Sequence, residues 1–138
     1  MENYLALGPL LVSRLKEKLA YVSISLHWVM PHIKEAHDLP PSILVFLEDD
    51  QPAQEVSRGA QQKVIQTWIA LVIIQDTDEA AGELISRVYR TLAGWSPDDT
   101  RFFPFRRVKS SYKPDVSPNG VSYFPLSFES SFIFDTQS

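Results

Sequence analysis

The sequence predicts an α+β fold, in which a mixed but mostly antiparallel sheet of about five strands packs against two main helices. Two observations support this prediction. Residues 64–74 are rich in β-branched and aromatic side chains and indicate a long strand, apolar on both faces over most of its length. The residues that follow, 76–94, carry apolar side chains at spacings of three and four, which is typical of an amphipathic helix. Every other segment has to pack on this strand and helix.

Length and composition narrow the class of protein. We expect the 138 residues, 1–138, to form a single domain whose core needs neither metal nor disulfide. Cysteine is absent, which excludes a disulfide framework, a thiolate zinc site and a cysteine nucleophile. The first residues do not resemble a secretory signal, and no apolar run is long enough to span a membrane. We therefore expect a soluble, cytoplasmic protein with no membrane partner.

The N-terminal part of the chain predicts one helix and two strands. Residues 5–19 are amphipathic, and the proline at position 9 suits the first turn of a helix. Residues 21–26 alternate between polar and apolar, so we expect a half-buried strand at a sheet edge. Residues 42–47 are apolar on both faces and predict a covered strand. The intervening residues, 27–38, are ambiguous and are interpreted as a short helix or turn.

Three histidines, His27, His32 and His37, lie in this ambiguous stretch. Their spacing of five places them on different faces of a helix, whereas a spacing of four would bring two histidines to one metal ion. No carboxylate pattern beside them matches a known ligand set. We expect surface or turn histidines, and we predict neither a metal site nor a cofactor.

A polar segment, residues 48–59, separates the second strand from the central one. It predicts a long hairpin with a projecting, acidic tip, longer than a tight turn requires. One interpretation is an ordinary solvated loop, and the other is a contact between subunits. The residues that would make such a contact are Glu48, Asp49, Asp50, Gln54, Glu55 and Arg58.

The helix after the central strand has clear start and stop signals. Asp76 can cap its first free amide groups, and Glu79, three residues later, completes a capping box. Gly94 can end the helix in a left-handed turn, and Pro97 prevents its continuation. The apolar stripe that should face the sheet consists of Ala81, Leu84, Ile85, Val88 and Leu92.

Residues 101–109 alternate aromatic and basic side chains and predict a strand with exposed bases. Four bases within nine residues, interleaved with aromatics, are typical of surfaces that bind single-stranded nucleic acid. The net charge of −4 and the absence of an RNA-binding signature argue against that interpretation. A small nucleic-acid-binding module that uses residues 101–113 is the alternative function. The four bases are Arg101, Arg106, Arg107 and Lys109.

The C-terminal part predicts a turn and then a long, covered strand. Proline is frequent in residues 113–120, and Asn119-Gly120 is a strong turn signal. Pro125 predicts a bulge or an edge position, because proline lacks the amide needed for pairing. One face of the strand, residues 121–134, must be buried because it carries Phe124, Leu126, Phe128, Ser130, Phe132 and Phe134.

The chain contains no motif of a common enzyme class. A glycine-rich phosphate loop, a nucleophile elbow and a paired-histidine metal motif are all missing from the sequence. Catalytic triads are assembled in space and leave no such motif, so an enzyme is the weaker interpretation rather than an excluded one. We predict a protein that is not an enzyme.

Several of these segments together resemble the tail terminator proteins of contractile-tailed phages, the Mu-like group. The resemblance rests on the glutamine-led apolar strand of residues 61–74, the acidic cap, and the helix that ends in Leu92-Ala93-Gly94-Trp95-Ser96-Pro97. The N-terminal helix, the Pro40-Pro41 pair and the aromatic last strand also match, so the resemblance covers nearly the whole chain. The chain departs from the family in its basic residues 106–109 and its proline-rich residues 113–120.

The resemblance implies a structural protein of a phage or prophage virion, with a tail-terminator-like fold. Such proteins form a homo-hexameric ring that caps the tail tube, stops the tail tube protein from polymerising further, and offers a docking surface to the head-tail connector protein. DNA would pass through the ring without specific binding, with Asp49 and Asp50 as candidate lumen residues. Assembly would take place in the host cytoplasm, and the protein would then remain in the virion tail.

The charge pattern agrees with a ring. Acidic residues cluster at 48–50, 76–79 and 98–99, whereas bases cluster at 101–113. Complementary patches on one chain favour head-to-tail contacts that close into a ring. We therefore predict that the acidic hairpin of one copy contacts the basic strand of the next.

Overall fold

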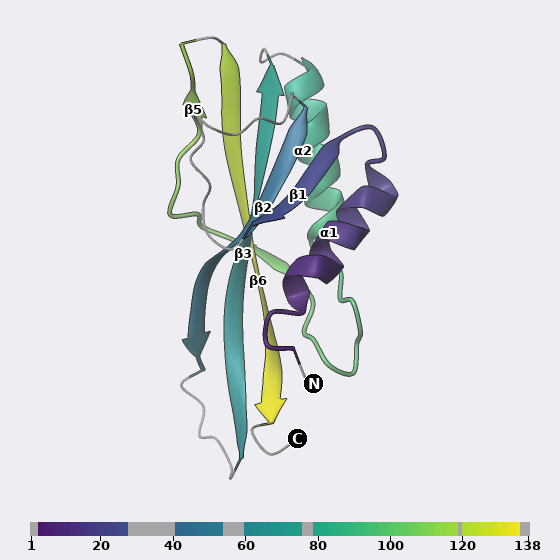
Figure 1. The fold of residues 1–138 in the computed structure, drawn as a ribbon, viewed down its shortest axis with the longest axis vertical. Helices are drawn as coiled ribbons and strands as arrows, with labels where there is room; N and C mark the ends of the chain where they lie inside the picture. The colour runs from purple at the N-terminus through teal and green to yellow at the C-terminus, as the bar shows by residue number, and fades with distance from the viewer. Residues whose placement is uncertain (1–2, 28–40, 54–59, 76–78, 119, 136–138) are drawn as a thin grey trace.

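The structure is a computed structural model, and it describes the whole chain except residues 1–2, 28–40, 54–59, 76–78, 119 and 136–138. The described residues form two helices and a six-stranded, mostly antiparallel sheet, so the predicted α+β class is confirmed with one strand more than expected (Figure 1). The elements in chain order are α1 (Leu7–Lys18), β1 (Ser23–His27), β2 (Ser42–Pro52), β3 (Gln61–Gln75), α2 (Glu79–Leu92), β4 (Arg106–Val108), β5 (Asp115–Val116) and β6 (Val121–Asp135).

The strands lie in the order β1-β2-β3-β6-β4, and β5 also pairs with β6. β1 runs parallel to β2, and all other pairs are antiparallel. β3 and β6 are both 15 residues long and pair over their full length without a shift of register, from Gln61 opposite Asp135 to Gln75 opposite Val121. These two strands, each about 50 Å long, form the spine of the molecule.

Both helices cover the same face of the sheet (Figure 1). The main core lies between the helices and the sheet. It includes Leu11 and Leu15 of α1, Val88 and Leu92 of α2, and the buried face of β6. That face is the row of phenylalanines that the sequence predicted to be covered. The remaining face of the sheet, the helix-free face, has a smaller buried cluster of Leu44, Phe46, Ile69, Leu71 and Ile73.

Part of the helix-free face is covered by residues 109–118, which lie on the side opposite the helices in Figure 1. The ring of Tyr112 packs edge-on against Phe46, with ring centroids 5.9 Å apart. Residues 68–74 of β3 are accordingly buried on both faces, as the sequence predicted. Pro125 pairs with Leu71 without a bulge and lies at the outer edge of β6, between the residues that pair with β5 and with β4.

The end of α2 is tied to the segment that leads into β4. Gly94 has a φ of 80°, the left-handed conformation expected of a glycine that ends a helix. Its backbone N–H donates to the carbonyl of Phe105 at 2.8 Å, and the N–H of Phe105 donates to the carbonyl of Trp95 at 2.8 Å. The rings of Trp95 and Phe105 stack with centroids 5.8 Å apart. The predicted cap, Asp76, lies outside the described residues.

Two predictions about the strand boundaries are wrong. Residues 48–52 were expected to be hairpin loop, but β2 continues to Pro52. Of the six predicted contact residues in this segment, Gln54, Glu55 and Arg58 lie outside the described residues. The basic strand is shorter than predicted, because β4 covers only Arg106–Val108 and is preceded by an isolated bridge between Phe102 and Phe132. Of the three histidines, His32 and His37 also lie outside the described residues.

Candidate subunit interface

The ends of β2, β3 and β6 extend past both helices at the lower end of Figure 1. We call this projection the arm and define it as residues 47–52, 61–67 and 129–135. It contains Glu48, Asp49 and Asp50, three of the acidic residues that the sequence selected as a contact surface. A β-bulge between Leu47 and Asp49 marks its start on β2, and bulges of this kind turn edge strands away from further pairing.

Glu48, at the bulge, is held within its own chain. Its Oε2 accepts hydrogen bonds from the backbone N–H of Ser111 at 2.8 Å and from the Ser111 hydroxyl at 2.6 Å. Its Oε1 accepts one from the hydroxyl of Ser127 at 2.5 Å. Glu48 therefore fastens the covering segment, residues 109–118, to the helix-free face.

Asp50 points to the opposite, helix-covered face. Both of its carboxylate oxygens accept hydrogen bonds from the hydroxyl of Tyr4, at 3.0 and 3.1 Å. The amide of Gln66, which is fully buried, donates to Asp50 at 3.1 Å and to the backbone carbonyl of Tyr4 at 3.2 Å. Burial, followed by the hydrogen bond to Asp50 and its charge, raises the pKa of Tyr4 to about 12. Asp50 thus secures the N-terminal segment to the arm.

Asp49 is exposed on the helix-free face and has a different set of neighbours. It pairs across strands with Thr67, Thr67 pairs with Glu129, and Glu129 pairs with Arg106. Directly paired residues point to the same side of a sheet. One row of four side chains therefore crosses the helix-free face, with an acid at one edge and a base at the other.

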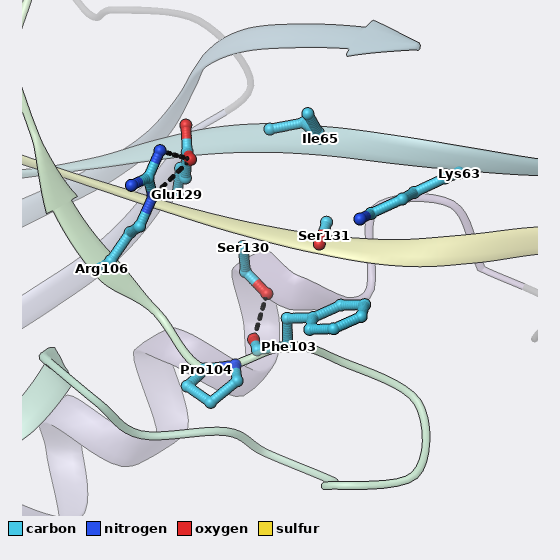
Figure 2. Close-up of a pocket in the computed structure, with 8 residues that line it drawn as sticks. All are labelled: Lys63, Ile65, Phe103, Pro104, Arg106, Glu129, Ser130 and Ser131. Carbon is cyan, nitrogen blue, oxygen red and sulfur yellow. Dashed lines mark hydrogen bonds and ion pairs between the residues drawn. The ribbon is translucent and has the colours of Figure 1, made fainter. Parts of the chain in front are cut away.

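The bases of the predicted basic strand do not share a face. Arg106 lies on the helix-free face, and its Nε and Nη2 both contact Oε1 of Glu129 at 2.6 Å (Figure 2). Arg107 points to the helix side, where its guanidinium lies 5.6 Å from the ring centroid of Tyr89. The guanidinium of Arg101 lies 5.2 Å from the ring of Phe102, and Lys109 is exposed. Only Arg106 therefore belongs to the row that contains Asp49.

A shallow hollow of about 310 Å³ lies beside Arg106 on the helix-free face of the arm. Figure 2 shows that its walls come from β3, β6 and the segment before β4. The Ser130 hydroxyl donates to the carbonyl of Phe103 at 2.6 Å, and the Nζ of Lys63 lies 4.8 Å above the Phe103 ring. The lining residues are Lys63, Ile65, Phe103, Pro104, Arg106, Glu129, Ser130 and Ser131.

The apolar surface in and beside the hollow is only partly covered within the described chain. Phe103 is 54 % exposed, and Ile133, which pairs with Lys63 on the same face, is 47 % exposed. Sequence reasoning missed this surface, because its residues come from three segments that only strand register brings together. The one available signal was the phenylalanine within the basic segment.

Other surface features are less suited to a contact. The acidic cluster at 98–99 begins a turn, in which Thr100 donates its N–H and hydroxyl to Asp98, and these hydrogen bonds keep the pKa of Asp98 below its usual value. His27 lies 2.9 Å from the Ser25 hydroxyl at the end of β1, beside an apolar hollow of about 230 Å³.

Among the described residues, no group of three or more acidic or histidine side chains could hold a metal ion. Neither described helix is long and apolar enough to cross a membrane.

Comparison with known proteins identifies the family. The family model described as "Phage tail terminator protein" matches residues 1–138, the whole chain. A chain in the solved virion of a native gene transfer agent particle has the same fold, with a TM-score of 0.53 and 15 % identity over 94 % of this chain and 89 % of that one. No curated protein matches the sequence. The resemblance noted in the sequence is thus confirmed at family level, and the chain belongs to the phage tail terminator family, a family of structural phage proteins.

Proposed function

We propose that this protein ends the tail of a phage or prophage particle. It caps the tail tube, stops the tail tube protein from polymerising further, and presents a surface to which the head-tail connector protein docks. The match of the family over all 138 residues is the observation that carries this proposal. Copies assemble in the host cytoplasm and remain in the virion tail.

The proposed working form is a homo-hexameric ring, closed by contacts between the acidic and basic regions of neighbouring copies. Its support is the position of the charges, because Asp49 lies on β2 and Arg106 on β4, at opposite edges of one sheet. Opposite charges at opposite edges favour contacts in which each copy uses one edge for each neighbour, and such contacts close into rings. The ring forms either free in solution or on the end of the tube.

DNA passes through the proposed ring without specific binding, because tight binding requires neutralisation of many phosphates. Asp49 and Asp50 were both candidates for lining the lumen, but they point to opposite faces of the arm, so one lumen would take only one of them. Asp50 bonds to Tyr4 and Gln66 on the helix side. Asp50, which is exposed, is the candidate that we retain for the bore, and a ring structure with Asp50 directed away from the bore would contradict it.

The alternative function, nucleic-acid binding by residues 101–113, has little support in the site. A basic groove that follows a phosphate backbone needs several unpaired cations on one surface. Arg106 is paired with Glu129, and Arg107 lies on the other face beside Tyr89. The segment therefore presents no continuous basic surface.

Deletion of the gene from its phage or prophage tests the proposed function. We expect tails of abnormal length that carry no heads, and we expect a plasmid copy of the gene to restore normal particles. Electron micrographs would show both. Tails of normal length joined to heads in the deletion strain would exclude the proposed function.

A further inference from the structure

Among the described strands, none pairs with the outer edges of the sheet near the row that joins Asp49 to Arg106. β1 pairs with β2 only as far as Phe46, so no described strand lies beside residues 47–52. β4 ends the sheet on the other side. Within one copy, three strand spacings, about 14 Å, separate Asp49 from Arg106. These two side chains can therefore meet only between copies.

The side chains at the two ends of this row, Asp49 and Arg106, have complementary charges. Asp49 is exposed, and no described side chain bonds to it in the structure. The Arg106 side chain is 74 % exposed and turns its Nε and Nη2 to Glu129. An arginine has five N–H donors in a planar fork, so it can bind a second carboxylate on its remaining side.

We propose that Asp49 of one copy binds Arg106 of the next copy, so that Arg106 lies between its own Glu129 and the neighbour's carboxylate. This inference rests on the proposed ring and names the residues that close it. The backbone of Phe105, just before β4, already bonds to Trp95 and Gly94. The contact is therefore made by side chains on the helix-free face rather than by an added strand.

The same contact would also cover the hollow drawn in Figure 2. Gln51 lies two residues after Asp49 and on the same face of β2. With Asp49 at Arg106, the arm of one copy lies over the hollow of the next and covers Phe103, which is 54 % exposed in the single chain. Burial of this apolar surface adds to the charge pairing.

Engineered cysteines test the contact directly, because the natural chain has no cysteine. The double variant Gln51→Cys/Phe103→Cys keeps Asp49 and Arg106 and places its cysteines beside them, on the arm and in the hollow. On mild oxidation it should form a covalent ladder of two, three and more copies that ends at the size of the closed ring. Intramolecular bridging is excluded, since a disulfide requires Cα atoms within about 7 Å. Each single variant should give no product larger than a dimer.

The matched control is Glu83→Cys/Phe103→Cys, which moves the cysteine of the arm to the exposed surface of α2. It should give no ladder. A short bis-maleimide reagent replaces oxidation in a parallel experiment, because it joins facing thiols that miss the geometry of a disulfide. Both reagents are applied to the purified protein and to assembled tails.

Each outcome of the cross-linking either supports or overturns the proposed contact. A ladder only from Gln51→Cys/Phe103→Cys supports the contact. Products that stop at a dimer would indicate a closed face-to-face pair and would overturn it, as would a ladder from the control. If light scattering shows a ring but neither reagent gives a ladder, this inference fails while the proposed function stands. If the deletion strain makes normal tails, the proposed function fails independently of any cross-link.

Discussion

Three consecutive carboxylates, Glu48, Asp49 and Asp50, have three different roles. Glu48 accepts three hydrogen bonds from Ser111 and Ser127 and holds the covering segment in place. Asp50 accepts hydrogen bonds from Tyr4 and Gln66 on the other face. Asp49 is exposed, and no described residue bonds to its side chain. The sequence shows a single acidic cluster, and the bulge after Leu47 together with the alternation of strand residues separates its members.

Glu48→Ala should lower the free energy of unfolding by about 1 to 3 kcal/mol, because it leaves hydrogen-bond donors without a charged acceptor. Hydrogen exchange should also accelerate in residues 109–118. Asp49→Ala is the matched control and should change stability by no more than about 0.5 kcal/mol. Equal effects of the two variants in denaturant titrations would contradict the separate roles.

Tyr4 should ionise only at high pH, with a pKa of about 12. Asp50→Asn should lower that pKa towards the ordinary value of 10, since it removes the charge and weakens the hydrogen bond that oppose ionisation. An ultraviolet titration measures both values. Tyr4→Phe should abolish the late transition, and its persistence in that variant would assign the shift to another tyrosine.

The raised pKa of Tyr4 also makes the stability of the fold depend on pH. The pKa of Tyr4 is higher in the folded chain than in the unfolded chain, so folding favours the protonated phenol. This contribution is complete below about pH 10 and is lost as the pH rises from about 10 to about 12. Tyr4→Phe should therefore lose less stability than the natural chain across that range.

At the scale of the elements, the approach of α1 to the sheet depends on one glycine. A Cβ atom at Gly8 would lie 2.7 Å from two ring atoms of Trp68 on β3. The ring cannot move freely, because its Nε1 donates to the buried Gln66 at 3.1 Å. The helix therefore rests on the tryptophan through a residue without a side chain.

Gly8→Ala should destabilise the fold by about 1 to 3 kcal/mol, the usual cost of overpacking a core. The control is Gly82→Ala on α2, where a Cβ would meet nothing within 4 Å. That substitution should stabilise the helix by about 0.5 to 1 kcal/mol, because alanine favours helix more than glycine. Thermal unfolding should separate the two variants in opposite directions, and a Gly8→Ala variant as stable as the natural chain would contradict the packing.

The long elements could be predicted because they have strong periodicity. β3 and β6 show apolar faces, and α2 shows one apolar stripe that ends at Gly94. The extension of β2 to Pro52 could not be predicted in this way, since residues 48–52 are polar and form an exposed edge. Their strand conformation comes from pairing with residues 64–67 of β3, which is a tertiary cause.

At the scale of the whole molecule, the candidate interface was only partly predictable. Composition identified an acidic region and a basic region, and the structure places Asp49 and Arg106 at the two edges of one sheet. The row that joins them depends on the register of four strands, which composition does not encode. For the same reason the sequence grouped Arg106 with Arg107, although they point to opposite faces.

The central claim is that oppositely charged edges join copies of this chain head to tail. Light scattering on two charge-reversal variants, Asp49→Lys and Arg106→Glu, tests it most directly. Each variant alone should assemble less than the natural chain, because each presents two edges of like charge, and the loss should diminish in high salt.

An equimolar mixture of the two variants is the decisive measurement. In a ring that alternates them, every contact is again between opposite charges, so the mixture should recover the oligomer size of the natural chain. The exposed α2 variants Glu83→Lys and Arg90→Glu should leave assembly unchanged. A mixture that assembles no better than either edge variant alone would contradict the account.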